Sequence, residues 1–169
     1  VINPVSGEIS PERKLELLKE ASRILNAPLF GFDTRSVAEF AEMSRELASE
    51  FDVLVVAGGD GTFSEVINAV DLRGVVLAYM PLGSGNALKS ALGYSGTLSE
   101  IATRIKNGKV YDYDLIECSG KKLAFMVSVG IEGVIVKLRE RYRQAGLKGI
   151  HSYIIPTLDA YFWRYKRTT

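Results

Sequence analysis

Three short glycine-rich segments carry the residue types with which proteins hold phosphate. They are Asn3-Pro-Val-Ser-Gly7, Gly58-Gly-Asp-Gly-Thr62 and Pro81-Leu-Gly-Ser-Gly-Asn86. Glycine lets the backbone approach an anion, and a helix that starts behind such a loop points free N–H groups at it. The second segment also places a carboxylate, Asp60, between glycines. Because a lone carboxylate repels an anion, a divalent cation bridging Asp60 and phosphate oxygens would reconcile the two.

The elements that must position these segments are alternating strands and helices. Each segment follows an expected strand directly: one ending at Val1-Ile2, and the continuous apolar runs 53–57 and 75–80, which are typical of buried parallel strands. A further short strand is expected at 29–32, with Thr34 just beyond it. Helices are expected at 11–25, behind the Ser36/Glu39 capping box, at 63–70, at 87–92 and from Thr97 to Gly108.

This alternation predicts an α/β fold with a parallel sheet. Ligands of such sheets bind outside the carboxyl ends of the strands, so the three segments and Thr34 should converge there. A single glycine-rich loop is more often only a tight turn, and Asp60 alone could serve as an N-cap for the helix at Phe63. Three such loops at equivalent strand ends favour a nucleotide site.

The pattern changes after Gly108. Residues 111–118 and 122–129 flank Ser119-Gly120 and predict an antiparallel hairpin. Residues 132–144 are charged and expected to be partly helical, and 150–165 predict an aromatic helix interrupted by Pro156. We therefore expect an α/β domain at 1–108, with its first strand truncated, and the beginning of a second, β-containing domain at 109–169.

Composition excludes several classes of protein. The 169 residues suit one domain, or one and a fragment, and both ends of the sequence suggest a fragment. A net charge of +1 argues against a nucleic-acid-binding surface, while one cysteine and one histidine exclude an internal disulfide and a zinc cluster. Without a signal peptide or an apolar stretch of about 18 residues, we expect a soluble, cytoplasmic protein.

Two familiar nucleotide-binding motifs do not fit. Residues 83–90 nearly match the P-loop pattern, but Leu88 stands where that pattern needs glycine before Lys89. The G-x-G-x-x-G fingerprint is absent at the first strand. A P-loop NTPase and a dinucleotide-dependent dehydrogenase are both disfavoured.

The motifs together resemble those of the diacylglycerol kinase catalytic family, which includes bacterial lipid kinases and sphingosine kinases. The resemblance lies in residues 3–7, in Gly58-Gly-Asp-Gly-Thr-Phe-Ser-Glu-Val-Ile-Asn68 and in Pro81-Leu-Gly-Ser-Gly-Asn-Ala87. Gly-Gly-Asp-Gly alone is shared with NAD kinases and 6-phosphofructokinases, whereas Pro-Leu-Gly-Ser-Gly-Asn is the lipid-kinase form. The resemblance implies a three-layer nucleotide-binding domain like that of 6-phosphofructokinases and NAD kinases, followed by the start of a lipid-binding β-sandwich.

The same resemblance implies ATP and Mg²⁺ as cofactors and Asp60 as the catalytic carboxylate. Asp60 would accept the proton of the lipid hydroxyl or hold Mg²⁺, directly or through phosphates or water. Arg143 is a candidate phosphate clamp because Tyr142-Arg143 is similar to a pair in sphingosine kinases, and a solvated basic helix face is its alternative. The expected nucleotide-binding residues are Asn3, Ser6, Gly7, Thr34, Gly58, Gly59, Asp60, Gly61, Thr62, Glu65, Ser84, Gly85, Asn86 and Arg143.

The expected function is transfer of the γ-phosphate of ATP to a lipid hydroxyl, most simply that of diacylglycerol or a related glycerolipid. Two departures from the family pattern bear on this. Glu8 replaces a lysine expected soon after Gly7, and the segment at Glu132 lacks an aspartate that meets the amino head group in sphingosine kinases. We expect peripheral membrane contact, no nucleic-acid partner and a possible homodimer. The alternatives are an enzyme like NAD kinase acting on a soluble substrate, a sphingosine or ceramide kinase, and a nucleotide-binding module without catalysis.

Overall fold

The computed structural model describes residues 1–4, 9–83, 85–147 and 151–165. The chain divides into two compact units, Val1–Phe125 and Met126–Thr169. The predicted boundary after residue 108 lies before this division, because the hairpin that follows residue 108 packs with the first unit.

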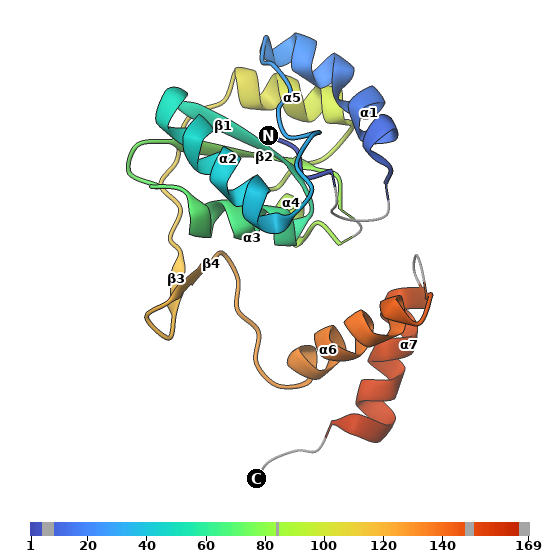
Figure 1. The fold of residues 1–169 in the computed structure, drawn as a ribbon. Coiled ribbons are helices and arrows are strands. Elements are labelled where there is room, and N and C mark those ends of the chain that lie inside the picture. Colours follow the sequence, from blue (N-terminus) through green and yellow to red (C-terminus); the bar gives the residue numbers. More distant parts are fainter. Residues whose placement is uncertain (5–8, 84, 148–150, 166–169) are drawn as a thin grey trace. The chain divides into compact units, whose positions relative to one another are not determined.

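A parallel sheet forms the centre of the first unit (Figure 1). Strands β1 (Val53–Gly58) and β2 (Val76–Pro81) pair in parallel, in register from Val53 opposite Val76 to Gly58 opposite Pro81. Ile2 extends the sheet on the other side of β1 through a parallel bridge to Ala57. The predicted parallel sheet is confirmed. The strand predicted at 29–32 is wrong, since among the described residues this segment makes one backbone bond to the sheet, from the Ile2 N–H to the Phe30 carbonyl at 2.9 Å.

Five helices surround this sheet in the described part of the first unit. They are α1 (Pro11–Leu25), α2 (Val37–Glu50), α3 (Asp60–Ala69), α4 (Ala87–Ala91) and α5 (Leu98–Lys106). Their starts follow the capping signals: the Ser10 hydroxyl accepts the N–H of Arg13, and Thr97 and Glu100 form a complete capping box. Helix α3 starts three residues earlier than predicted, at Asp60 itself.

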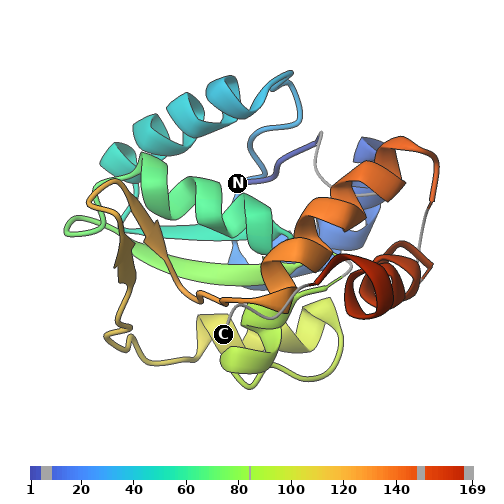
Figure 2. The same ribbon diagram turned by 90° about the horizontal axis from the view of Figure 1, so that it is seen from below.

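Alternating strand residues build two apolar cores, because successive side chains of a strand face opposite sides of the sheet. Leu54 and Val56 pack with Phe40 of α2 and Val66 of α3. Ala57 and Met80 pack with residues of α1 and α5, among them Leu18, Ala21, Ile101 and Ala102. The sheet thus lies between the pair α1–α5 and the pair α2–α3, as Figures 1 and 2 show.

The predicted hairpin forms but is shorter than expected. Strands β3 (Ile116–Cys118) and β4 (Lys122–Ala124) pair antiparallel over three residues each. The flanking residues remain without strand structure, and Tyr111 and Val129 are largely exposed, so they lack the packing that would extend the hairpin. Whether 109–169 begin a β-sandwich stays a prediction.

The second unit is helical in its described residues. Helix α6 (Ile131–Gln144) is continuous rather than partly formed, and α7 (His151–Asp159) passes through Pro156 without the predicted interruption. The chain then forms a π-helical turn, η1 (Ala160–Arg164), in which the Tyr165 N–H donates to the Ala160 carbonyl at 2.8 Å. Within the described residues, no helix is long and apolar enough to span a bilayer.

Candidate active site

The loops that follow β1 and β2 touch each other through glycine backbones. A Cβ atom added to Gly83 would lie 2.5 Å from the Cα atom of Gly59, and one added to Gly59 would lie 3.3 Å from the Cα atom of Gly83. The Leu82 N–H also donates to the Gly58 carbonyl at 2.8 Å. Position 83 therefore needs glycine for close packing of the two chain segments, whereas a methyl group at Gly59 would require a smaller shift.

Asp60 joins these two loops by hydrogen bonds. It is the first residue of α3, and its Oδ2 and Oδ1 atoms accept the backbone N–H groups of Ala87 and Leu88, each at 3.0 Å. These N–H groups open α4, whose own N-cap residue, Asn86, makes no side-chain capping bond. Asp60 thus caps α4, and the interpretation of Asp60 as N-cap of its own helix is wrong, because Gly59 occupies that position.

Asn86 closes the third loop from within. Its backbone is left-handed at φ 51°, and its Oδ1 atom accepts the Gly83 N–H at 2.9 Å and the Tyr79 hydroxyl at 3.1 Å. Burial, together with the negative charge of Asp60, raises the pKa of the Tyr79 phenol. Both effects favour the neutral Tyr79 hydroxyl, which is the form that donates to Asn86.

The described start of the first loop, Asn3-Pro4, is held by a residue that the sequence analysis missed. Asn3 is buried, and the Ile2–Ala57 bridge places it beside the carboxyl end of β1. The Lys14 ammonium of α1 is also buried and donates to the Asn3 and Pro4 carbonyls at 2.8 and 3.0 Å. Burial lowers the pKa of this ammonium. A signal was present: Lys14 shares the helical spacing of the buried residues Leu18 and Ala21.

Thr34 lies just beyond the point where its segment crosses Ile2. Gly31, at φ +106°, approaches so closely that an added Cβ atom would lie 2.2 Å from the Ile2 carbonyl oxygen. The Thr34 hydroxyl donates to the Gly31 carbonyl at 2.8 Å. Thr34 is therefore fixed near the same edge of the sheet as Asn3.

Thr62 is the buried polar residue of the second loop. An added Cβ atom on Gly58 would lie 2.6 Å from the Thr62 Cβ atom, so the two positions are in tight contact. The Thr62 hydroxyl oxygen is buried and has no hydrogen-bond partner among the described residues. A buried unpaired hydroxyl is costly, which makes this atom a candidate ligand contact.

The remaining predicted residues divide into three groups. Gly61, Glu65 and Gly85 are exposed in the second and third loop regions. Ser6, Gly7 and Ser84 lie outside the described residues. Arg143 belongs to α6 in the second unit, where its guanidinium lies 3.7 Å from the Glu140 carboxylate, and its role as a phosphate clamp stays a prediction.

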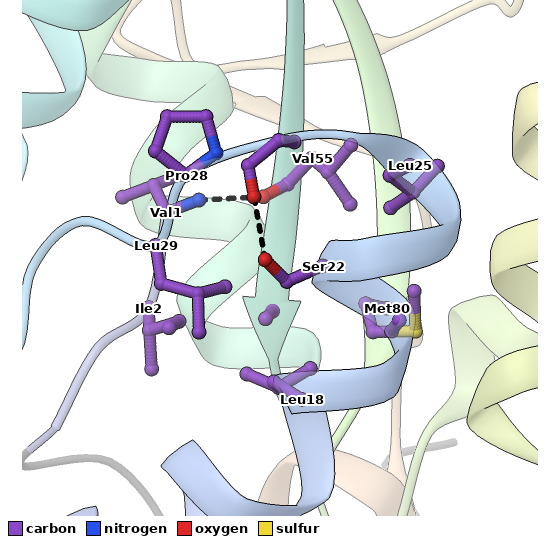
Figure 3. Close-up of a pocket in the computed structure, with 12 residues that line it drawn as sticks. Val1, Ile2, Leu18, Ser22, Leu25, Pro28, Leu29, Val55 and Met80 are labelled. Atoms are coloured by element: carbon purple, nitrogen blue, oxygen red, sulfur yellow. Dashed lines mark hydrogen bonds between the residues drawn. The ribbon is translucent and has the colours of Figure 1, made fainter.

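The cavity found in the described part of the first unit is not an alternative nucleotide site. A cavity of about 40 Å³ lies between α1 and the sheet, lined by apolar residues such as Leu18, Leu25 and Met80 (Figure 3). It is a packing void and too small for a nucleotide. The described residues also contain no cluster of three histidine, cysteine or acidic side chains.

The geometry agrees with what comparison of the sequence shows. A family model described as the diacylglycerol kinase catalytic domain matches residues 1–118. The chain belongs to this family. The resemblance noted from the loop motifs is thereby confirmed.

Individual relatives are similar over different parts of the chain. The sequence is 32% identical to a diacylglycerol kinase of Staphylococcus saprophyticus over 100 residues, 54% of this chain and 31% of that protein. It is 29% identical to a diacylglycerol kinase of Bacillus subtilis over 132 residues, 72% and 41% of the two chains. It is also 29% identical to an uncharacterized protein of Synechocystis over 165 residues, 91% and 38% of the two chains. The chain therefore spans less than half the length of each of these relatives.

A solved structure shows the same fold. The crystal structure of a putative diacylglycerol kinase from Bacillus anthracis superposes with a TM-score of 0.59 and 25% sequence identity. The superposition covers 71% of this chain and 45% of the other.

Proposed function

We propose that this chain is the nucleotide-binding part of a lipid kinase that transfers the γ-phosphate of ATP to the hydroxyl of diacylglycerol or a related glycerolipid. The observation that carries the proposal is the joining of two glycine-rich loops by the Asp60 carboxylate at the carboxyl ends of β1 and β2. Membership of the diacylglycerol kinase catalytic family supports the reaction class.

The residues present suit the phosphates of ATP. Helix α3 has glycine at its N-cap and no side-chain cap among the described residues, so its first N–H groups remain available to an anion. The Thr62 hydroxyl, unpaired among the described residues, lies in the first turn of the same helix. The backbone contact of Gly59 with Gly83 keeps side chains out of the crossing point of the two loops.

Asp60 suits a magnesium ion that is held mainly by phosphate oxygens and water, as Mg²⁺ usually is in kinases. Both carboxylate oxygens already accept an N–H group, yet each keeps a further lone pair. When bound, Mg²⁺ would neutralise charge on the transferring phosphoryl group. Through its remaining lone pairs Asp60 would hold the ion or accept the proton of the attacking lipid hydroxyl. Such a transfer depends on positioning more than on an unusual pKa.

We further propose that the first unit is the three-layer nucleotide-binding domain of this family and that residues 109–169 lead into the lipid-binding β-sandwich. The lipid would be reached by peripheral contact with the membrane. The exposed aromatic residues near Trp163 suit either a lipid surface or a neighbouring domain.

The decisive experiment presents the natural full-length protein with γ-labelled ATP, Mg²⁺ and vesicles containing diacylglycerol. Label should pass into the organic phase, and omission of diacylglycerol or of Mg²⁺ should abolish this transfer. Vesicles with ceramide or sphingosine in place of diacylglycerol test the sphingolipid alternative. Label that stays in a water-soluble product when NAD is supplied would contradict the proposal and favour the enzyme like NAD kinase. ATP binding without transfer to any acceptor would indicate a non-catalytic module.

A further inference from the structure

Asn68, in the last turn of α3, makes hydrogen bonds that normally belong to a neighbouring strand. Its Nδ2 atom donates to the Leu123 carbonyl of β4 at 2.9 Å, and its Oδ1 atom accepts the Leu123 N–H at 2.8 Å. Nδ2 also donates to the Ser64 carbonyl at 2.8 Å, which fixes the side chain on its own helix. A side-chain amide has the donor and acceptor of a peptide group, so Asn68 pairs with β4 as one residue of a strand would.

Leu123 depends on this pairing because of its place in the hairpin. It lies opposite Glu117, in the middle of the three pairs of β3 and β4. Pairs in an antiparallel ladder alternate between those that exchange hydrogen bonds and those that do not. Since both backbone groups of Leu123 bond to Asn68, Leu123 belongs to a pair that makes no bonds across the hairpin. Its N–H is therefore protected by Asn68.

A second contact joins the same helix to the same hairpin. The ring of Phe125, the last residue of the first unit, makes a T-shaped contact with the ring of Phe63. The two ring centroids are 6.0 Å apart, and the ring planes form an angle of 82°. Helix α3 thus holds the hairpin by a polar contact at its end and an aromatic contact near its start. Because α3 begins with Asp60, the polar contact lies about 12 Å along the helix from the proposed catalytic carboxylate.

We propose that Asn68 is a positioning residue that fixes the hairpin to the helix bearing Asp60. It thereby sets the point from which the chain leaves the first unit toward the proposed acceptor domain. The kinetic part of this inference rests on the proposed function, whereas the anchoring itself does not. Loosening the anchor should disturb transfer to the acceptor while leaving the nucleotide loops intact.

The anchoring is tested by hydrogen exchange in the full-length protein. Asn68→Ala removes all three bonds and should accelerate exchange of the Leu123 amide about tenfold. Asn68→Asp keeps an acceptor for that amide but loses both donated bonds, so its exchange should fall between wild type and Asn68→Ala. Asn107→Ala removes an exposed asparagine from the end of α5 and is the matched control. Unchanged hydrogen exchange of the Val56 amide, in the central strand, would show that the core stays folded. Unchanged exchange at Leu123 in Asn68→Ala would overturn the proposal.

The positioning role is tested by separating nucleotide binding from acceptor use. Asn68→Ala should lower kcat/KM for the lipid about tenfold and leave the Kd for ATP within about twofold of wild type. Equal losses in ATP binding and in transfer would mean general damage to the fold and would also overturn the positioning role of Asn68. Absence of lipid phosphorylation in the wild-type protein would refute the proposed function instead, and the exchange of Leu123 would then decide the anchoring alone.

Discussion

The two units of the chain differ in how far they bury their apolar side chains. The first encloses them on both faces of a sheet, with Phe40 and Val56 fully buried. The second leaves Tyr161, Phe162 and Trp163 each more than 60% exposed. A site that needs atoms fixed to within fractions of an ångström requires a rigid interior, whereas an exposed aromatic surface suits contact with something else. Under the proposed function, the first unit would hold the reacting atoms in place and the second would offer a surface for contact.

Replacing Asp60 should have the largest effect on the first unit, because this side chain joins two loops and is also the proposed catalytic group. We expect Asp60→Asn to lower phosphoryl transfer about a thousandfold, equivalent to about 4 kcal/mol of transition-state stabilisation. ATP binding should fall less, since an amide oxygen can still accept one N–H group of α4. Initial rates and ATP titrations measure the two effects. Asp112→Asn, in an exposed extended segment, is the control, and full activity of Asp60→Asn would remove Asp60 from the mechanism.

A pair of aromatic substitutions tests the contrast in burial directly. Phe40→Ala should lower the free energy of unfolding of the first unit by about 3–5 kcal/mol, since it empties a fully buried site. Trp163→Ala should change stability by less than about 0.5 kcal/mol, because this side chain is 71% exposed. Urea unfolding followed by circular dichroism measures both. Similar losses in the two variants would show that the aromatic surface of the second unit is covered in the folded protein.

The crossing of the loops can be tested with glycine substitutions. Gly83→Ala should lower the free energy of unfolding by about 1–3 kcal/mol and weaken ATP binding, because the new methyl group must separate the second and third loops. Gly74→Ala is the matched control, since an added Cβ atom there meets nothing within 4 Å. Thermal unfolding and ATP titration compare the two proteins. Tight ATP binding by Gly83→Ala would argue against a cradle that depends on this contact.

The smallest expected effect lies in a surface turn of the first unit. The Arg73 guanidinium donates two hydrogen bonds to Asp71 and lowers the pKa of that carboxyl to about 2. A carboxylate with a lowered pKa stabilises the fold above its unfolded pKa, and this contribution is lost as pH falls from about 4 toward 2. Arg73→Gln should raise the pKa of Asp71 toward its ordinary value, which an NMR titration measures. Stability near neutral pH should hardly change, because the pair is exposed to solvent.

Much of the first unit could be predicted because its local signals agree. The apolar runs at β1 and β2, the Ser10 cap and the Thr97/Glu100 capping box each correspond to an element of the structure. The convergence of the second and third loops also followed from parallel strands. The contact of Asp60 with α4 could not be predicted, because it joins residues 27 positions apart and depends on the left-handed backbone of Asn86.

The errors occur where tertiary contacts decide the outcome. Residues 29–32 have the composition of a strand, but among the described residues their backbone bond to the sheet is made with Ile2 alone. The hairpin stops where Leu115 and Phe125, on either side of it, pack against the core of the first unit instead of pairing with each other. Lys14 was missed because its burial depends on a tertiary contact, in which the carbonyl oxygens of Asn3 and Pro4 accept its ammonium. Pro156 suggested a break, yet α7 continues through it.

The touching backbones of Gly59 and Gly83 have a mechanical consequence. The two turns touch, and the hydrogen bonds from Ala87 and Leu88 to Asp60 also resist their separation, so both turns should move together when either is displaced. A single spectroscopic probe on one turn would then report the state of the other. An inhibitor that wedges the two apart would disable both with one small group.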